Sequence, residues 1–244
     1  MFGSARQLYT GEIYLQTQYP EESFLGSLGQ DQYGDLYRYV KVGASNITAG
    51  KLQLAPTQKT NHHNRPAYAA VTADGRNNAV TLTLGATAAV ANEYYGGFLV
   101  ANDNVPEGTQ YRITGHPAAD SAGNLEVKVD RPFIESITTS SEFTLVHNRW
   151  NAVVEGTTVT IRAAGVPLVD MTAAYYGWVK TKGVASVLIG ANATLGADLI
   201  VGGTAGAVTD RTDALGASAE PVVAVADIVL GVTGEFNPVT LCID

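Results

Sequence analysis

Residues 79–84 read Ala79-Val80-Thr81-Leu82-Thr83-Leu84, an alternation of apolar and polar side chains that is typical of a half-buried β-strand. The same pattern returns at residues 125–129, and short runs rich in Val, Ile and Thr lie at residues 158–161 and 239–243. Turn sequences such as Asp74-Gly75 separate these runs at close intervals. Short strands between frequent turns predict an all-β fold, built as β-sandwich or barrel units of antiparallel strands.

Helices are not expected to contribute much. No window of the sequence carries a sustained apolar stripe at helical spacing between an N-cap and a C-terminal glycine. The Ala-rich stretch 86–91 is the main exception, because its composition suits a helix. We therefore expect a helix content under about 15%.

The length of 244 residues suits one large β domain or two small ones, and two are favoured. We expect a first domain at residues 35–150 and a second at residues 151–244, preceded by an N-terminal segment at residues 1–34. Only 16% of the residues are charged, so much of the surface must consist of small and weakly polar side chains, which suit packing against other protein. The net charge of −8 argues against nucleic acid as a partner.

The N-terminal segment differs from the rest of the chain. Its aromatic residues are spaced five to nine positions apart, without the alternation of a packed strand: Tyr9, Tyr14, Tyr19, Phe24 and Tyr33. This spacing predicts an extended arm whose order depends on a partner, with Tyr9, Tyr14, Tyr19 and Phe24 as the candidate contact residues. The alternative is that the same rings cover the core of their own chain.

Residues for chemistry are scarce. His62-His63 is expected in a polar loop, because adjacent residues of an extended segment face opposite sides and no second cluster supplies further metal ligands. The only cysteine, Cys242, is far in sequence from any histidine and is expected to be buried as a small apolar residue. Nucleophile and phosphate-binding motifs are absent. The sequence predicts no catalytic residues, no metal site and no cofactor.

Targeting signals are also absent from the sequence. Residues 1–6 lack the basic and apolar regions of a secretory signal, and no stretch approaches about 18 uninterrupted apolar residues. We expect a protein that is made in the cytoplasm and has no membrane partner.

A weak internal echo joins the two halves of the chain. Val80-Thr81-Leu82-Thr83 precedes Tyr94-Tyr95-Gly96, as Val159-Thr160-Ile161-Arg162 precedes Tyr175-Tyr176-Gly177-Trp178. The echo suggests two related β units, although a β protein rich in Gly and Tyr produces such matches by chance. The tyrosines and Trp178 could form a platform for glycans, or they could fill a β core.

Several stretches resemble a known family. The strand pair at residues 35–52 resembles a recurring element of phage virion proteins, and the stretch at residues 97–118 resembles segments of phage structural proteins. The pair at residues 175–189 is similar to a strand pair of tailed-phage capsid decoration proteins, also called cement proteins. Leu195-Gly196-Ala197-Asp198-Leu199 matches the Gly-rich turn that usually follows in that family, whereas residues 222–227 match its closing strand only loosely.

The resemblance implies a virion structural protein on the capsid exterior. Its partner would be the major capsid protein, and it would form a homo-oligomer, most commonly a trimer. Such a protein needs contact area and shape complementarity rather than reactive groups. The competing functions are a head-fibre, tail or baseplate component that binds glycans, and a virion-borne hydrolase, which the scarcity of titratable clusters disfavours.

Overall fold

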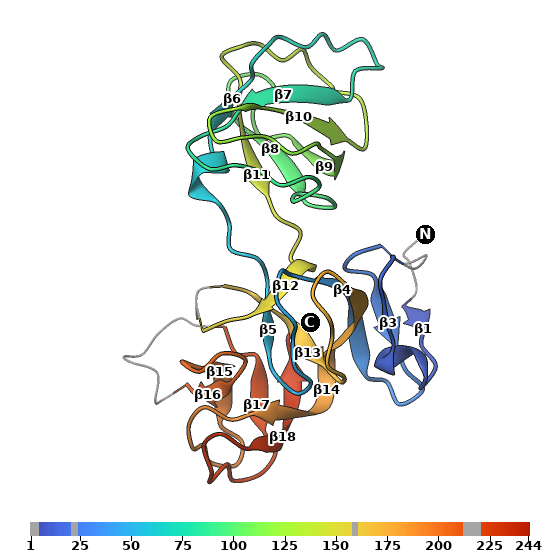
Figure 1. The fold of residues 1–244 in the computed structure, drawn as a ribbon, viewed down its shortest axis with the longest axis vertical. Coiled ribbons are helices and arrows are strands. Elements are labelled where there is room, and N and C mark those ends of the chain that lie inside the picture. Colours follow the sequence, from blue (N-terminus) through green and yellow to red (C-terminus); the bar gives the residue numbers. More distant parts are fainter. Residues whose placement is uncertain (1–4, 21–23, 158–160, 212–220) are drawn as a thin grey trace. The chain divides into compact units, whose positions relative to one another are not determined.

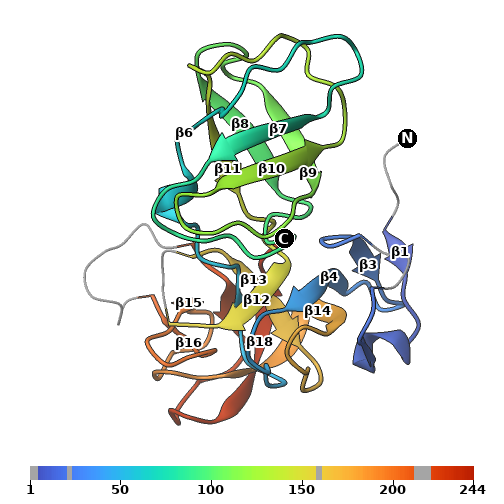
Figure 2. The same ribbon diagram turned by 45° about the horizontal axis from the view of Figure 1, so that its top comes forward.

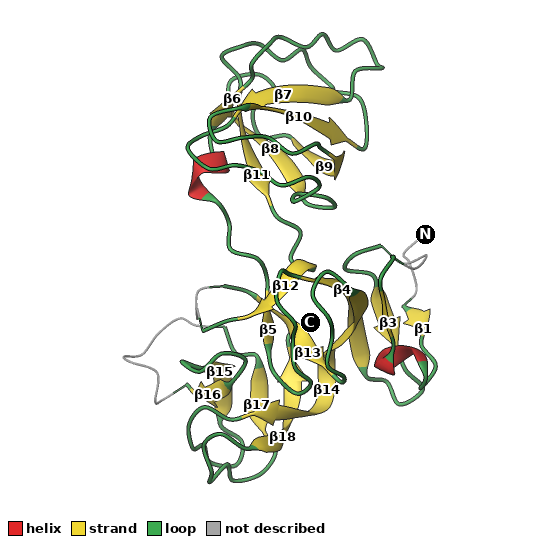
Figure 3. Ribbon diagram, in the orientation of Figure 1, coloured by secondary structure: helices red, strands yellow, loops and turns green. Residues whose placement is uncertain are grey.

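The computed structural model describes residues 5–20, 24–157, 161–211 and 221–244, and this part of the chain is almost entirely β. Its helical elements are two 3-10 helices of three residues each, η1 (Glu12–Tyr14) and η2 (Thr60–His62), which are red in Figure 3. The Ala-rich stretch 86–91 is a loop. The prediction of an all-β protein with barrel-like units is therefore confirmed.

The chain divides into two compact units, and we describe each by itself. Unit 1 combines residues 1–56 with residues 152–244, and unit 2 consists of residues 57–151 (Figure 1). The strands assigned to unit 1 are β1 (Arg6–Gln7), β2 (Gln16–Thr17), β3 (Leu28–Gln30), β4 (Leu36–Val42), β5 (Gln53–Leu54), β12 (Asn151–Glu155), β13 (Ala163–Pro167), β14 (Tyr176–Leu188), β15 (Asp198–Val201), β16 (Val208–Asp210), β17 (Ala224–Ala226) and β18 (Phe236–Cys242). Those of unit 2 are β6 (Arg65–Pro66), β7 (Ala79–Thr83), β8 (Phe98–Asp103), β9 (Gln110–Gly115), β10 (Asn124–Val129) and β11 (Glu142–Val146).

The expected boundary at residues 150 and 151 lies within one residue of the division after residue 151, but the expected grouping of residues 35–56 with the residues that follow them is not found. Residues 35–56 were expected in the first domain, but β4 pairs with β14, and β5 pairs with both β12 and β13. Strand patterns and turn residues mark where strands begin and end, but they do not identify the partner of a strand. Unit 2 is therefore an insertion between β5 and β12 of unit 1.

Unit 2 is a six-stranded antiparallel barrel. The strands pair in the order β6-β11-β8-β9-β10-β7, and a bridge between Ala67 and Leu82 joins the two ends of this row. Alternate residues point inward, as the alternation at residues 79–84 predicts, and they form one apolar core. Gly97 is required directly before β8, because a Cβ atom there would overlap the carbonyl oxygen of Val146. The two-residue strand β6 and the single bridge between Ala67 and Leu82 close the row of strands, which shortens the free edge of the sheet.

Unit 1 contains two rings of strands that share β14. The first ring runs β4-β12-β5-β13-β14 and returns to β4. The second runs β14-β18-β17-β15-β16, and a parallel bridge from Val208 to Ile189 returns it to the end of β14. The 13 residues of β14 make this possible, because Tyr176–Lys182 pair with β4 and Lys182–Leu188 pair with β18. Figures 1 and 2 show β14 between these neighbours.

An ion pair between buried Lys180 and half-buried Asp35 lies where β14 passes from the first ring to the second. The Lys180 ammonium contacts the Asp35 carboxylate and also donates to the carbonyl of Val184 at 2.7 Å. Gly183 has a φ of +102°, and a Cβ atom there would overlap the Asp35 carboxylate. Only glycine both adopts this φ without strain and leaves room for the Asp35 carboxylate. Gly183 therefore fixes the point at which β14 changes partners.

A small turn element recurs in both units, and we call it the bridged turn. Two residues from different segments exchange backbone hydrogen bonds of 2.8 to 3.0 Å, and each of them is followed directly by a turn. In six of the eight segments, the carbonyl of the residue after the bridge residue accepts from the N–H three positions later. The four pairs of bridge residues are Ile47 with Met171, Val71 with Ile137, Ala89 with Ala119, and Ala193 with Leu230.

The bridged turn explains why the sequence pattern around Tyr-Tyr-Gly occurs twice. Tyr94-Tyr95 follows the turn after Ala89, and Tyr175-Tyr176 follows the turn after Met171. Of the residues 158–161, which were expected as a strand before the second copy, residues 158–160 lie outside the described residues. The feature that recurs is therefore a turn that leads into a strand.

We expect unit 1 to fold without unit 2. Leu54 of β5 and Val154 of β12 are direct antiparallel partners, so the chain leaves and re-enters unit 1 at neighbouring positions. Replacing residues 57–151 by a Gly-rich turn of about four residues converts β5 and β12 into an ordinary hairpin. The shortened protein and a fragment of residues 57–151 should each unfold in one cooperative transition, measured by circular dichroism. A shortened protein without a thermal transition would contradict this.

Candidate docking surface

The N-terminal segment is held on unit 1 by its own contacts. β1 pairs with β3, β3 pairs with β4, and β2 pairs with β14. Leu8 and Ile13 are buried against Tyr37, Tyr39 and Trp178. The segment is thus not a detached arm, and its order comes from unit 1 rather than from a partner. The sequence did not show this, because two apolar residues among polar ones form no strand pattern.

The candidate aromatic residues nevertheless face outward. The exposed fractions are 74% for Tyr9, 50% for Tyr14, 75% for Tyr19 and 77% for Phe24. The alternative that these rings belong to the core of their own chain is therefore wrong. Two further exposed residues, Leu15 and Tyr33, add to the same segment. We call these six residues the aromatic surface.

Local hydrogen bonds explain why the backbone is ordered while the rings are not buried. The Glu12 carboxylate binds the Arg6 guanidinium at 2.5 Å and accepts from the backbone N–H of Tyr9 at 2.8 Å. These bonds close the turn that contains η1 and direct Ile13 inward. Ring contacts in the described part of the chain join Tyr39 to Tyr176 and Trp178, but they involve none of the four candidates.

The charge of the segment is negative. Residues 1–34 contain one arginine and four acidic residues, which gives a local charge of −3. Exposed aromatic rings among carboxylates suit a protein partner that presents arginine or lysine, since cations bind the faces of aromatic rings. The arrangement suits binding.

A second cluster of notable side chains lies inside unit 2, around the fully buried Tyr94. The Tyr94 hydroxyl contacts His62 Nδ1 at 2.5 Å, its backbone N–H donates to His116 Nε2 at 3.0 Å, and its ring stacks on His147. Three of the four histidines therefore share one neighbour. The expectation that His62 lies in a polar loop is wrong, because its side chain is completely buried.

The outer partners of these histidines fix their neutral forms. His62 Nε2 donates to the carbonyl of Thr87 at 2.8 Å, and His116 Nδ1 donates to the carbonyl of Pro117 at 2.8 Å. Burial lowers the pKa of both imidazoles below the ordinary value of 6.5. The cluster serves as a hydrogen-bonded core.

Glu93 connects this cluster to Lys59. Its carboxylate accepts from Lys59 Nζ at 2.7 Å and contacts His147 Nε2 at 3.2 Å. Burial alone would raise the pKa of Glu93, but the hydrogen bonds from His147 and Lys59 outweigh it and lower the pKa to about 2. The described residues contain no group of three or more His, Cys, Asp or Glu side chains placed to hold a metal ion.

Two further sequence expectations concern single residues. Cys242 is exposed rather than buried, because alternation along β18 turns Val239 and Leu241 inward and Cys242 outward. Of the aromatic residues that could form a glycan platform, Tyr94 and Trp178 are buried and fill the cores of their units. Tyr95 is 38% exposed, and Tyr175 and Tyr176 are half-buried.

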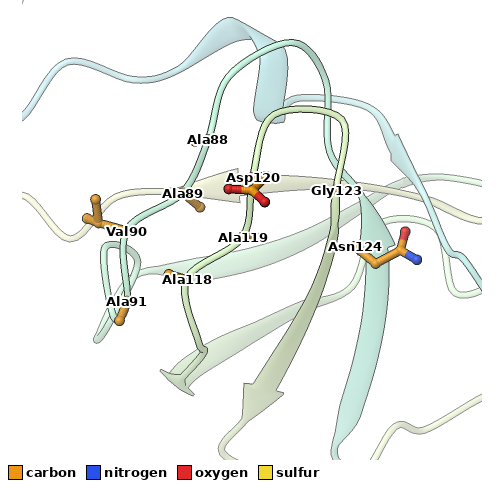
Figure 4. Close-up of a pocket in the computed structure, with 9 residues that line it drawn as sticks. All are labelled: Ala88, Ala89, Val90, Ala91, Ala118, Ala119, Asp120, Gly123 and Asn124. Carbon is orange, nitrogen blue, oxygen red and sulfur yellow. The ribbon is translucent and has the colours of Figure 1, made fainter.

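The surface of unit 2 carries a depression of about 500 Å³ between two loops (Figure 4). The bridged turns of Ala89 and Ala119 form it, and Asp120 and Asn124 are its only polar side chains. No cation or histidine lines it. The depression therefore lacks the converging polar groups that a binding site for small molecules requires.

Comparisons with known proteins identify no relative. No protein-family model matches the sequence, and neither a curated protein nor a solved structure matches it. None of the helices in the described ranges is long and apolar enough to cross a membrane.

Proposed function

We propose that this protein is a virion structural protein that binds the outer surface of the major capsid protein shell and stabilises it. The observation that carries the proposal is the contrast within the N-terminal segment. Its backbone is fixed by Leu8 and Ile13, whereas Tyr9, Tyr19 and Phe24 are each about three-quarters exposed. Rings held outward on an ordered backbone bind a partner without a large loss of entropy on ordering.

The resemblance to capsid decoration proteins supplies the identity of the partner. The low content of charged residues agrees with a surface that packs against protein. We further propose that the protein acts outside the capsid as a homo-oligomer, with a trimer as the preferred form, and that it is not an enzyme. The glycan-binding alternative has less support, because two of its platform residues, Tyr94 and Trp178, are buried.

The test uses shells assembled from the major capsid protein that the same genome encodes. We expect the triple variant Tyr9→Ser, Tyr19→Ser, Phe24→Ser to lose most of its binding to these shells in co-sedimentation, because interface aromatic residues carry much of the binding energy. Its thermal stability should be unchanged, since the three rings are exposed.

A matched control is Tyr68→Ser, which removes a 62% exposed tyrosine from unit 2 and should leave binding unchanged. Binding of the triple variant at wild-type affinity would show that the aromatic surface is not the attachment site. Sedimentation equilibrium of the wild-type protein alone tests the trimer, which a monomer at micromolar concentration would contradict.

A further inference from the structure

One of the four pairs of bridged turns differs from the others on its exposed side. At the position before the bridge residue and at the second position after it, side chains are exposed or half-buried throughout. In the pair of Ala193 and Leu230, three of these four positions carry large apolar residues, namely Val229, Leu195 and Val232. Their exposed fractions are 69%, 66% and 51%.

The other three pairs show what the turn itself requires. Before the bridge residue, their sequences have Asn46, Asp170, Ala70, Ser136, Ala88 and Ala118. Two positions after it, they have Ala49, Ala173, Ala73, Thr139, Ala91 and Ser121. Small or polar residues are thus sufficient at every equivalent position. The fold does not explain why Leu195, Val229 and Val232 are large and apolar.

These three residues lie together because their turns are cross-linked. Ala193 and Leu230 exchange hydrogen bonds of 3.0 and 2.8 Å, and Gly196 N–H donates to the carbonyl of Ala226 at 2.9 Å. Ile228, which directly precedes Val229 in the chain, is 42% exposed. We call Leu195, Ile228, Val229 and Val232 the apolar tip.

We propose that the apolar tip is a second docking surface of unit 1, and that it takes a protein surface with an apolar centre and basic residues around it. This inference rests on the proposed function, and it assigns the tip to a second contact with the same capsid shell.

The charge around the tip selects this partner. Residues 191–198 and 224–236, which contain the tip, have three acidic residues, Asp198, Asp227 and Glu235, and no lysine or arginine. Asp198 contacts Arg211 at 3.6 Å, so Asp227 and Glu235 carry the negative charge beside the tip. A second copy of the chain would bring this negative charge against itself, and an anionic lipid surface would be repelled as well.

The tip and the aromatic surface are separate. The N-terminal segment pairs with β14 at Tyr176 and Gly177, whereas Phe236, just after the tip, pairs with Leu188 at the other end of β14. Thirteen residues of strand span up to about 40 Å. In Figures 1 and 2 the segment around β1 and the strands β15 to β18 lie on opposite sides of unit 1. Two contacts at this separation tie two places on a shell together.

The experiment replaces the large apolar residues of the tip by residues that occupy the equivalent positions of other bridged turns. The triple variant Leu195→Ala, Val229→Asn, Val232→Ala places Ala, Asn and Ala where the bridged turn already has them in Ala49, Asn46 and Ala173. Its melting temperature should therefore match that of the wild type. Its dissociation constant for the capsid shells should rise at least about tenfold, because loss of one of two linked contacts removes avidity.

The control variant is Val90→Ala, Ile134→Ala, which removes two side chains of 65% and 63% exposure from unit 2 and should bind as the wild type does. Higher ionic strength should weaken wild-type binding. Wild-type affinity of the tip variant overturns this inference alone, whereas failure of the wild-type protein to bind shells overturns the proposed function and the inference with it. Sedimentation velocity tests whether the tip binds a second copy of the chain instead. If the wild-type protein self-associates and the tip variant does not, the tip is a contact between copies and the proposed partner is wrong.

Discussion

Replacing Leu8 by alanine is expected to lower the free energy of unfolding of unit 1 by about 2 to 5 kcal/mol, the range for a buried leucine that leaves a cavity. Leu8 is 1% exposed and lies against Gly29, where a Cβ atom would overlap the Leu8 side chain. It also covers Tyr37, Tyr39 and Trp178, so its loss loosens the attachment of the whole segment. Urea unfolding followed by the fluorescence of Trp178 measures the effect.

The neighbouring residue provides the control. Tyr9 is 74% exposed, so Tyr9→Ser should change the free energy of unfolding by no more than about 0.5 kcal/mol. Deleting residues 1–34 should destabilise unit 1 more than Leu8→Ala does, because it uncovers Tyr39 and removes the pairing of β3 with β4. A truncated protein as stable as the full chain would show that the segment is a dispensable arm after all.

Acid is expected to unfold unit 2 while unit 1 stays folded. All four histidines lie between residues 62 and 147, within unit 2. Burial lowers the pKa of His62 and His116, so the folded state stays neutral at a pH where the unfolded chain already binds protons. The stability of unit 2 is therefore complete above about pH 6.5 and falls below it.

The size of this effect has an upper bound. Each histidine that stays neutral contributes a loss of at most about 1.4 kcal/mol per pH unit, so the pair gives up to about 4 kcal/mol between pH 6.5 and pH 5. Protonation of His116 Nε2 also removes the acceptor of the Tyr94 N–H. At lower pH, Glu93 adds a further loss, because its pKa of about 2 lies below its ordinary value of 4.5.

The two tryptophans allow each unit to be followed separately. Trp150 lies in unit 2 and Trp178 in unit 1, so the variants Trp178→Phe and Trp150→Phe each leave one reporter. Thermal unfolding between pH 7.5 and pH 5 should show a falling midpoint for Trp150 and a nearly constant one for Trp178. If both midpoints shifted by the same amount, the pH dependence would not come from the histidines of unit 2. In the variant His116→Gln, the unfolding midpoint reported by Trp150 should fall less steeply with decreasing pH.

The sequence predicted the strands better than their partners. Residues 79–84 and 125–129 became β7 and β10, because a two-residue alternation reports directly which side of a strand is buried. The insertion of unit 2 was missed, because pairing between β5 and β12 joins residues about a hundred positions apart. A local pattern carries no information on such distances.

For the candidate sites, the sequence identified the residues but not their surroundings. Tyr9 and Phe24 were recognised as unusual, whereas their ordered backbone depends on Leu8, which no pattern distinguishes. The bridged turn had a signal that could have been found, since an apolar residue followed by threonine occurs at Ile47-Thr48, Ile137-Thr138 and Met171-Thr172. Ala193-Thr194 has the same pattern, so an alignment would have shown Leu195 as a departure, whereas Leu230 is followed by Gly231 and the segment of Val232 carries no such signal.

The insertion of unit 2 through two neighbouring strands has a mechanical consequence. Both ends of the described chain belong to unit 1, and the chain enters and leaves unit 2 next to β5 and β12, which are paired to each other at Leu54 and Val154. A stretching force applied between the chain ends must therefore pass through the hydrogen bonds of unit 1 first. Unit 2 carries no load until β12 separates from β5, so a pulled molecule should yield in a fixed order, with unit 1 extending before unit 2.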